Sequence, residues 1–394
     1  MLFSILPYIH SGCRVQVYAS LAAIRKVSYG GQVSLHHLTF SGTSYEQGLA
    51  HGEELKDSIE KNIEVYFNRF EKEAGIDKNE LIDNARIYLS VLREQNPEYV
   101  NGINGISESS SLDLYEIAML NHRYELLYDA LGKRYIEDTV DGCTSFALLP
   151  EATENNHLIM GQNWDWIPDV DCVLTTSKDV DGLQRLAFTE AGIFSGKPGM
   201  NSEGVGLAVN GMYSTSDDWS RLKKPFHLRC YEVLKSRNMD GALNALTGTY
   251  RSCTANFILG HSPQRAVSVE LAPNYFRLID PLGGIISHAN HFNDPSALGV
   301  FEPLNTRRYL SEFRQKHMEK LLIEQKPVDI GGLQNILRDH EHQPQSLCRH
   351  RDETLPGSQH TITKTSMIID LDEKKMWVTD GQPCKSEFEE FYFD

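Results

Sequence analysis

A cysteine directly behind a glycine is the pair of residues in this chain with the most distinctive chemistry. Cys143 follows Gly142 and opens a run typical of a β-strand, Cys143–Leu149. Glycine lets the backbone adopt conformations closed to other residues, so the thiol can approach the carbonyl carbon before it. Attack on that carbon would form a thioester, which water would then open. The pair therefore predicts self-cleavage between residues 142 and 143, into chains 1–142 and 143–394.

The freed cysteine would carry unusual chemistry of its own. The α-amine of Cys143 would have a pKa of about 8, far below that of a lysine side chain. One residue would then supply both the nucleophile and the base of an N-terminal nucleophile enzyme. The two residues alone leave an alternative open, because a buried cysteine after glycine often serves only as a small apolar side chain.

Helices are expected before this cysteine and strands after it. Apolar periodicity predicts helices over Glu53–Ala74, Glu80–Arg93 and Leu112–Leu131. Short segments rich in β-branched or aromatic residues predict strands at Cys143–Leu149, Leu158–Gln162, Cys172–Thr176, Gly204–Val209, Asn256–Leu259, Ala266–Leu271, Tyr275–Ile279, Ser366–Leu371 and Lys375–Thr379. Further helices are predicted at Phe226–Ser236, Met239–Ala245, Asn305–Glu324 and Gly331–Arg338. Helices that come first and last around mostly antiparallel strands predict an α+β protein with stacked sheets covered by helices.

Several motifs around the cysteine keep a fixed order along the chain. The main one is Gly161-Gln162-Asn163-Trp164-Asp165-Trp166, one hairpin after Cys143. Others are Gly48-x-x-His51-Gly52, Leu120-Asn121-His122-Arg123-Tyr124-Glu125, Thr189-Glu190-Ala191-Gly192-Ile193, Gly199-Met200-Asn201-Ser202-Glu203-Gly204, His288-Ala289-Asn290-His291 and Cys348-Arg349. Together they resemble the acyl-CoA:6-aminopenicillanic acid (isopenicillin N) acyltransferase family of cysteine peptidases, which includes Tan-type hydrolases of β-alanyl amines.

The resemblance implies a fold and a set of site residues. The fold is a four-layer αββα sandwich of the N-terminal nucleophile (Ntn) hydrolase type, over residues 38–394. Cys143 would be the nucleophile and Asp165 a polar anchor for its freed α-amine. Asn290 would stabilise the tetrahedral oxyanion, and Arg349 would orient a carboxylate or carbonyl. The alternatives are a turn residue or a partner to buried backbone amides for Asp165, a strand-end cap for Asn290 and a surface charge for Arg349.

Other residues of the same motifs are expected to support this site. Thr144 and Ser145 would lie next to the nucleophile. Arg123 and Glu125, on the helix before the cut, are interpreted as a structural ion pair or a pocket wall. Trp164 is expected in the core or in the pocket lining.

The substrate is expected to be a small N-acyl amine, such as β-alanyl-dopamine or carcinine. The family's Glu-Phe-Ser-Pro run reads Glu270-Leu271-Ala272-Pro273 here, which argues against a penicillin substrate in particular. Acyl-CoA-dependent N-acylation of an amine is the alternative reaction, and a binding protein that never processes itself is the alternative class. No cofactor is expected.

Composition restricts the partners further. The formal net charge of −16 argues against nucleic acid, which requires a basic surface. No apolar run reaches the length that spans a membrane. The seven cysteines are irregularly spaced and predict free thiols rather than a disulfide framework. A metal site remains as an alternative use of His340, His342, Cys348, His350 and His360, although their spacing matches no familiar ligand pattern. The partners expected are thus a small-molecule substrate and the two processed chains themselves.

The first residues form a separate segment. From Met1 to Tyr45 there is no acidic residue, while Arg14, Arg25 and Lys26 are basic. Residues 1–37 are expected to be an extension that is disordered or a targeting segment. The C-terminal residues carry no peroxisomal signal. We therefore expect a cytoplasmic protein, with mitochondrial targeting as the alternative.

Overall fold

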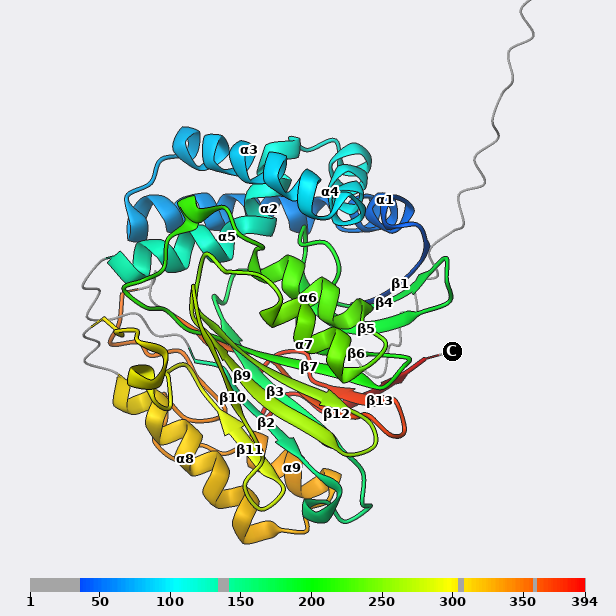
Figure 1. Cartoon of the computed structure of the whole chain (residues 1–394), viewed down its shortest axis with the longest axis vertical. Helices are drawn as coiled ribbons and strands as arrows, with labels where there is room; N and C mark the ends of the chain where they lie inside the picture. The colour runs from blue at the N-terminus through cyan, green and yellow to red at the C-terminus, as the bar shows by residue number, and fades with distance from the viewer. Residues whose placement is uncertain (1–35, 134–141, 304–307, 357–359, 394) are drawn as a thin grey trace, which may run out of the picture.

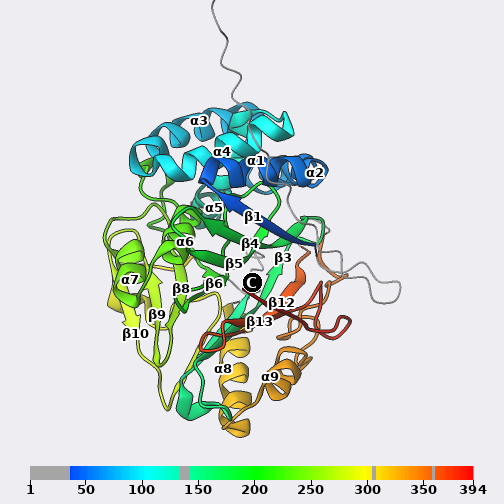
Figure 2. The same ribbon diagram turned by 90° about the vertical axis from the view of Figure 1, so that its right-hand side faces the viewer.

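The computed structural model describes residues 36–133, 142–303, 308–356 and 360–393 (Figure 1). Two β-sheets lie at the centre, and helices cover their outer faces in the two views of Figures 1 and 2. The predicted extension, residues 1–37, lies outside the described residues except for its last two. The layers confirm the predicted α+β fold with four layers in the order αββα.

The first sheet has eight strands and draws on both halves of the chain. Their spatial order is β1 (His37–Gly42), β4 (Cys172–Asp179), β5 (Gln184–Glu190), β6 (Gly199–Asn201), β7 (Val205–Gly211), β8 (Ala255–His261), β9 (Arg265–Leu271) and β10 (Phe276–Ile279). β1 pairs with β4 in parallel, and the other neighbours in this sheet pair antiparallel. β1, which precedes the predicted cut, therefore shares a sheet with strands that all follow the cut.

The second sheet carries the cysteine. Its six strands are β11 (Ile285–His288), β2 (Thr144–Leu148), β3 (Ile159–Trp166), β12 (Ile362–Asp370), β13 (Lys375–Val378) and β14 (Glu389–Tyr392), all paired antiparallel. Every residue of β2 and β3 is buried. Such strands are covered on both faces, by the other sheet and by helices, and so lack the alternation of a half-exposed strand.

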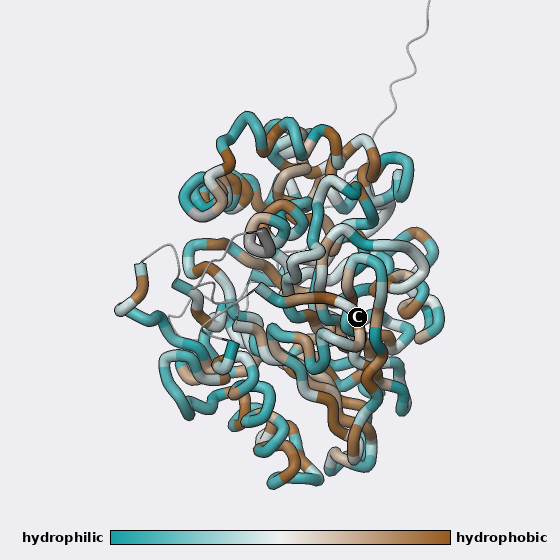
Figure 3. Tube along the Cα trace, turned by 60° about the vertical axis from the view of Figure 1, so that its left-hand side comes forward, coloured by the Kyte–Doolittle hydropathy of each residue, from teal (hydrophilic) through white to brown (hydrophobic). Residues whose placement is uncertain are grey.

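Helices form the two outer layers. α6 (Phe226–Lys235) and α7 (Met239–Thr247) lie against the eight-stranded sheet, and α8 (Arg308–Gln325) and α9 (Ile330–Leu337) lie against the six-stranded one. The remaining helices gather beside β1 and α6 and are α1 (Ser44–Glu54), α2 (Lys56–Arg69), α3 (Lys78–Gln95), α4 (Pro97–Ser110) and α5 (Leu114–Lys133). Figure 3 shows hydrophilic residues along the outer helices and hydrophobic stretches among the strands. None of the described helices is long and apolar enough to cross a membrane.

Capping side chains fix where several helices begin. Thr43 and Glu46 form a reciprocal capping box at the start of α1. Asp77 accepts hydrogen bonds from backbone N–H groups at the start of α3, and Asn96 does the same before Pro97 of α4. These bonds satisfy backbone donors that the first helical turn leaves without partners.

Some elements were missing from the sequence prediction. These are β1, β5, β6, β11, β14, α4 and all of α1 except its last two residues. α4 contains two glycines, Gly102 and Gly105, which lower helix propensity. Gly105, together with Gly48 of α1, allows the two helices to approach closely. A Cβ on Gly105 would lie 2.3 Å from the carbonyl oxygen of Tyr45, and one on Gly48 would lie 2.2 Å from that of Gly102. The helix predicted over Glu53–Ala74 is instead divided at Leu55 and ends in a π-helical turn, Phe70–Ala74.

Candidate active site

Cys143 lies directly before β2, the second strand from one edge of the six-stranded sheet. β2 begins at the next residue, and its pairing with β3 places Thr144 opposite Asn163. The Cys143 side chain is 4% exposed, and its Sγ lies 3.7 Å from the backbone carbonyl oxygen of Asp165. The hairpin thus brings the cysteine beside the end of the Asn-Trp-Asp motif.

The carbonyl of Gly142 is bound by an arginine from α8. Arg314 Nη1 donates a hydrogen bond to the Gly142 carbonyl oxygen and lies 3.4 Å from both the Cys143 carbonyl oxygen and Thr144 Oγ1. The Arg314 side chain is completely buried. A permanent positive charge therefore contacts the carbonyl of the peptide bond that the sequence marks for cleavage.

Asn290 lies next to this arginine rather than on the Gly142 carbonyl. Its Oδ1 accepts a hydrogen bond from Arg314 Nη2 at 3.1 Å, and its Nδ2 donates to the carbonyl oxygen of Gly211 at 2.9 Å. The amide therefore orients Arg314 across the two sheets. In the described chain the donor on the Gly142 oxygen is Arg314.

Asp165 and Arg349 form a buried ion pair on the other side of Gly142. Arg349 Nε lies 3.2 Å from Asp165 Oδ2, and neither side chain is more than 1% exposed. Thr363 Oγ1 donates to Asp165 Oδ1 at 2.7 Å and accepts from the Arg349 backbone N–H at 2.8 Å. Asp165 lies within β3 and Arg349 is buried, so the alternatives of a turn residue and a surface charge are wrong.

Gly142 has no room for a side chain. A Cβ on it would lie 2.5 Å from Arg349 Nε, 2.6 Å from Arg349 Cζ and 2.7 Å from Asp165 Oδ2. Cβ atoms do not approach other heavy atoms within 3.0 Å. The backbone before Cys143 is thus held between Arg314 on its carbonyl and the Asp165–Arg349 pair.

A chain of polar side chains joins the two sheets beneath Cys143. Ser145 Oγ donates to Asn210 Oδ1 at 2.6 Å, and Asn210 Nδ2 donates to the Cys143 carbonyl oxygen at 3.2 Å. Asn256 Nδ2 and Ser268 Oγ continue this network with bonds of 3.0 and 2.8 Å. Buried polar groups that are satisfied in this way fix one arrangement of a core.

Sequence reasoning missed Asn210 and Arg314. Asn210 directly follows the predicted strand Gly204–Val209, and a polar residue at the end of an apolar strand was the available signal. Arg314 lies in a charged helix, four residues after Leu310 and four before Met318, and this spacing on the apolar face of the helix was the available signal. Its side chain is 0% exposed.

Arg123 and Glu125 do not pair with each other. Arg123 forms its salt bridge with Glu190, and the same carboxylate contacts Lys197 and Tyr66. Burial alone would raise the pKa of Glu190, but the charges of Arg123 and Lys197 outweigh it and lower that pKa to about 2. The predicted ion pair between Arg123 and Glu125 is therefore wrong, because the carboxylate that pairs with Arg123 is that of Glu190.

Glu125 is a buried carboxyl of another kind. Its Oε1 accepts a hydrogen bond of 2.6 Å from the backbone N–H of Phe226 at the start of α6. Burial raises its pKa to about 7 in spite of this bond.

Trp164, the remaining motif residue, packs in the core. Its ring lies 5.2 Å from that of Phe188, and Lys197 Nζ lies 4.4 Å from the centroid of the Trp164 ring.

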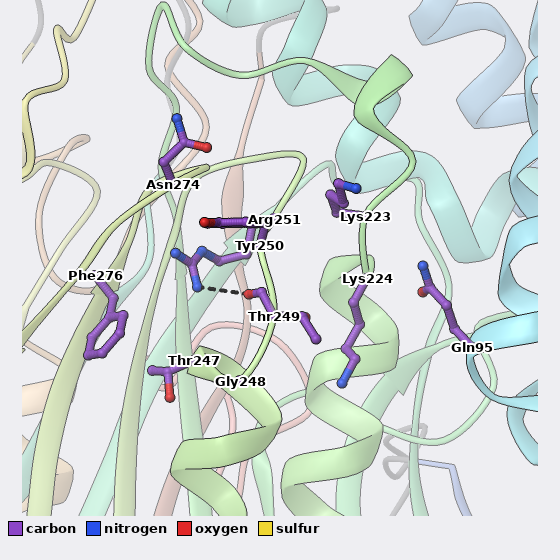
Figure 4. Close-up of a pocket in the computed structure, with 10 residues that line it drawn as sticks. All are labelled: Gln95, Lys223, Lys224, Thr247, Gly248, Thr249, Tyr250, Arg251, Asn274 and Phe276. Atoms are coloured by element: carbon purple, nitrogen blue, oxygen red, sulfur yellow. Dashed lines mark hydrogen bonds between the residues drawn. The ribbon is translucent and has the colours of Figure 1, made fainter.

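A surface hollow of about 730 Å³ lies beside α6 and α7 (Figure 4). It is lined by Gln95, Lys223, Lys224, Thr247, Gly248, Thr249, Tyr250, Arg251, Asn274 and Phe276. Arg251 donates to the carbonyl oxygens of Thr249 at 3.1 Å and Ala272 at 2.6 Å, so its guanidinium is used to hold the loop. None of the residues around Cys143 lines this hollow.

The comparison with protein families identifies the chain. A model of the acyl-coenzyme A:6-aminopenicillanic acid acyl-transferase family matches residues 152–385, which is more than half of the sequence. The chain belongs to this family. A relative from Emericella nidulans, the 40 kDa form of acyl-coenzyme A:6-aminopenicillanic-acid-acyltransferase, is 27% identical over 357 residues, covering 88% of this chain and 93% of the relative. The family predicted from the motifs is thereby confirmed, and with it an enzyme that acts on amide bonds.

Solved structures also resemble parts of this acyltransferase-family chain. A mutant of the conjugated bile acid hydrolase from Clostridium perfringens has 11% identity and a TM-score of 0.44, covering 64% of this chain and 97% of that one. The penicillin V acylase from Agrobacterium tumefaciens has 15% identity and a TM-score of 0.42, covering 60% and 83%. The Caenorhabditis elegans ortholog of N-acylethanolamine-hydrolyzing acid amidase has 13% identity and a TM-score of 0.44, covering 58% and 93%.

Proposed function

We propose that the chain cuts itself between Gly142 and Cys143 and then uses the Cys143 thiol to cleave small N-acyl amines. The observation that carries this proposal is the hydrogen bond from Arg314 to the Gly142 carbonyl oxygen. A cation on that oxygen polarises the carbonyl and stabilises the negative charge that forms when a nucleophile adds to its carbon. Burial strengthens the effect, because water does not screen the charge.

Self-cleavage would proceed from the contacts around Gly142. Sγ of Cys143 attacks the carbonyl carbon of Gly142, and Arg314 holds the resulting oxyanion. The C–N bond then breaks, its nitrogen takes the proton that the thiol gave up, and Gly142 is left as a thioester on Cys143, whose α-amine is now free. Water opens the thioester and releases the carboxylate of Gly142 and the thiol of Cys143. The Asp165 carboxylate, which borders Gly142, would accept a hydrogen bond from that neutral amine and hold it in position.

The same groups would serve a substrate amide. Once the Gly142 carboxylate leaves, a substrate carbonyl takes the position of the Gly142 carbonyl, between Sγ of Cys143 and the guanidinium of Arg314. The α-amine accepts the thiol proton and passes it to the departing amine. The acyl group stays on Cys143 as a thioester until water removes it. Asn290 and Arg349 keep Arg314 and Asp165 in place throughout both cycles.

Contacts between the two chains support their remaining together after the cut. β1 of the first chain pairs with β4 of the second over Gly42 and the five residues before it. His51 Nε2 accepts a 2.9 Å hydrogen bond from the Gly192 backbone N–H, and Asn121 Nδ2 donates to the Gly192 carbonyl oxygen at 2.9 Å. Because sheet and core are shared, the product is a stable pair of chains 1–142 and 143–394.

Denaturing electrophoresis and mass spectrometry of the purified protein test the first step. Wild type should give two chains, the second beginning at Cys143, in place of the intact 44.6 kDa chain. Cys143→Ala should stay intact and inactive, whereas Cys143→Ser should cleave slowly. Wild type that remains intact under conditions that favour processing would favour the alternative of a binding protein of the same fold.

A panel of amides tests the second step. We expect release of amine from N-β-alanyl-dopamine and carcinine by wild type, and none by Cys143→Ala. The second candidate function is transfer of an acyl group from acyl-CoA to an amine, which the name of the Emericella nidulans relative favours. Incubation with acyl-CoA and an acceptor amine separates the two, since product formed only with acyl-CoA would contradict the hydrolase proposal.

A further inference from the structure

Four side chains with metal-binding atoms lie close together in two loops next to Arg349. They are His340, Cys348, His350 and Cys384, and one ligand atom of each lies within 4.8 Å of those of the others. Nε2 of His350 lies 3.0 Å from Nε2 of His340, 3.7 Å from Sγ of Cys348 and 3.4 Å from Sγ of Cys384. Cys348 is buried and Cys384 lies at the surface.

These separations match the edges of a tetrahedral zinc site. Zinc binds histidine nitrogen at about 2.0–2.1 Å and thiolate sulfur at about 2.3 Å. At tetrahedral angles those bond lengths place two nitrogens about 3.3 Å apart and a nitrogen and a sulfur about 3.6 Å apart. The three distances from His350 Nε2, 3.0, 3.4 and 3.7 Å, lie within a few tenths of an ångström of these values.

Hydrogen bonding alone does not account for the arrangement. One nitrogen, Nε2 of His350, faces a second imidazole nitrogen and two sulfurs. An imidazole nitrogen carries either one proton or one lone pair and so makes one strong hydrogen bond. A cation at the centre would instead accept a lone pair from each of the four groups. Two thiolates and two neutral imidazoles leave a Zn²⁺ site with no net charge.

The four ligands come from two loops that are separate in the sequence. His340 to His350 follow α9, and this loop is closed by hydrogen bonds from Cys348 N–H to the Asp339 oxygen and from His350 N–H to the Pro344 oxygen, both 3.0 Å. Cys384 follows β13, two residues after Gln382, whose Nε2 donates to the Arg349 carbonyl oxygen at 2.9 Å. Since the two segments meet beside Arg349, a shared ion would fix both.

We infer that His340, Cys348, His350 and Cys384 bind one structural zinc ion that ties the C-terminal segment to the loop carrying Arg349. Only three of these four were among the residues that the sequence suggested as ligands. His342 instead packs its ring 4.9 Å from that of Phe313, and His360 Nε2 hydrogen-bonds to the Leu355 carbonyl oxygen at 3.0 Å. Arg349 lies between two of the ligands in sequence, so the ion would position its guanidinium against Asp165.

Metal analysis of full-length protein tests the site. Wild type, purified without chelators, should contain about one zinc per chain by inductively coupled plasma mass spectrometry. His340→Asn and Cys384→Ser should each lower the zinc content about tenfold or more. His342→Asn is the matched control and should keep the zinc, because His342 has a φ of 72° that asparagine tolerates. Thermal unfolding in each preparation checks that the variants are folded.

Cobalt substitution provides a second readout that does not depend on activity. Protein stripped of metal and given Co²⁺ should show thiolate-to-cobalt charge-transfer bands and the intense visible bands of tetrahedral Co²⁺. His342→Asn should show the same spectrum, and Cys384→Ser should lose it. The inference is overturned if wild type neither contains zinc nor binds Co²⁺, if both ligand variants keep their zinc, or if mass spectrometry after alkylation finds Cys348 and Cys384 joined as a disulfide.

Discussion

Replacing Gly142 with alanine tests whether self-cleavage depends on the close contact of this residue with the Asp165–Arg349 pair. The new Cβ would lie 2.5 Å from Arg349 Nε and 2.7 Å from Asp165 Oδ2. Neither side chain has open space to move into, since both are at most 1% exposed, and Arg349 is also held by Thr361 at 3.0 Å. The strain must therefore be relieved by moving Gly142 itself, together with the carbonyl that Arg314 binds.

The size of that movement sets the expected loss. Ordinary contact begins at 3.4 Å, so the new Cβ and Arg349 must separate by roughly 0.9 Å, and a misplacement of about 1 Å in a reacting group costs about a hundredfold in rate. This corresponds to about 2.7 kcal/mol in the activation free energy of cleavage. Gly142→Ala should thus cleave about a hundredfold more slowly than wild type.

Cell-free translation sampled over time and resolved by denaturing electrophoresis measures this rate directly. Gly331→Ala is the control, because a Cβ there would have its nearest neighbour at 3.7 Å, and it should cleave as fast as wild type. Cleavage of Gly142→Ala within about threefold of the control would refute the reasoning, since it would show that the close contact at Gly142 does not position the reacting carbonyl.

Three further perturbations address other parts of the structure. Arg314→Lys keeps the charge but loses the planar pair of donors, so self-cleavage in the same time course should slow by about 10²-fold or more. An unchanged rate would show that Arg314 takes no part in the cleavage step. Glu190→Gln leaves two buried cations without their anion and should lower the free energy of unfolding in urea by about 3–5 kcal/mol, whereas the exposed Glu203→Gln should change it by less than about 0.5 kcal/mol. Glu125 has its pKa raised from 4.5 to about 7 in the folded chain, so the folded state holds a proton that the unfolded state releases, and stability should fall as the pH rises through that window. Glu125→Gln should remove about 3 kcal/mol of this pH dependence, and an equal slope in both proteins would contradict the assignment.

The sequence alone determined the family and the position of the proposed nucleophile. The Gly142-Cys143 junction and the Asn-Trp-Asp motif are local features, separated by a single hairpin, so strand pairing brings them together. The layered α+β fold also followed from the order of helices and strands. These features depend on residue type and short spacing, which a linear sequence preserves.

The tertiary structure decided which side chains surround that nucleophile. Arg314 reaches the Gly142 carbonyl across 172 positions of sequence, and Cys384 reaches His350 across 34. α4 was missed because its glycines disfavour an isolated helix, yet one of them, Gly105, allows it to pack closely on α1. Contacts of this kind depend on how separate layers pack and on which polar groups are left inside after packing. The spacing of Arg314 with Leu310 and Met318 on one face of α8 could indicate that the arginine is buried, but no local pattern could show which carbonyl it binds.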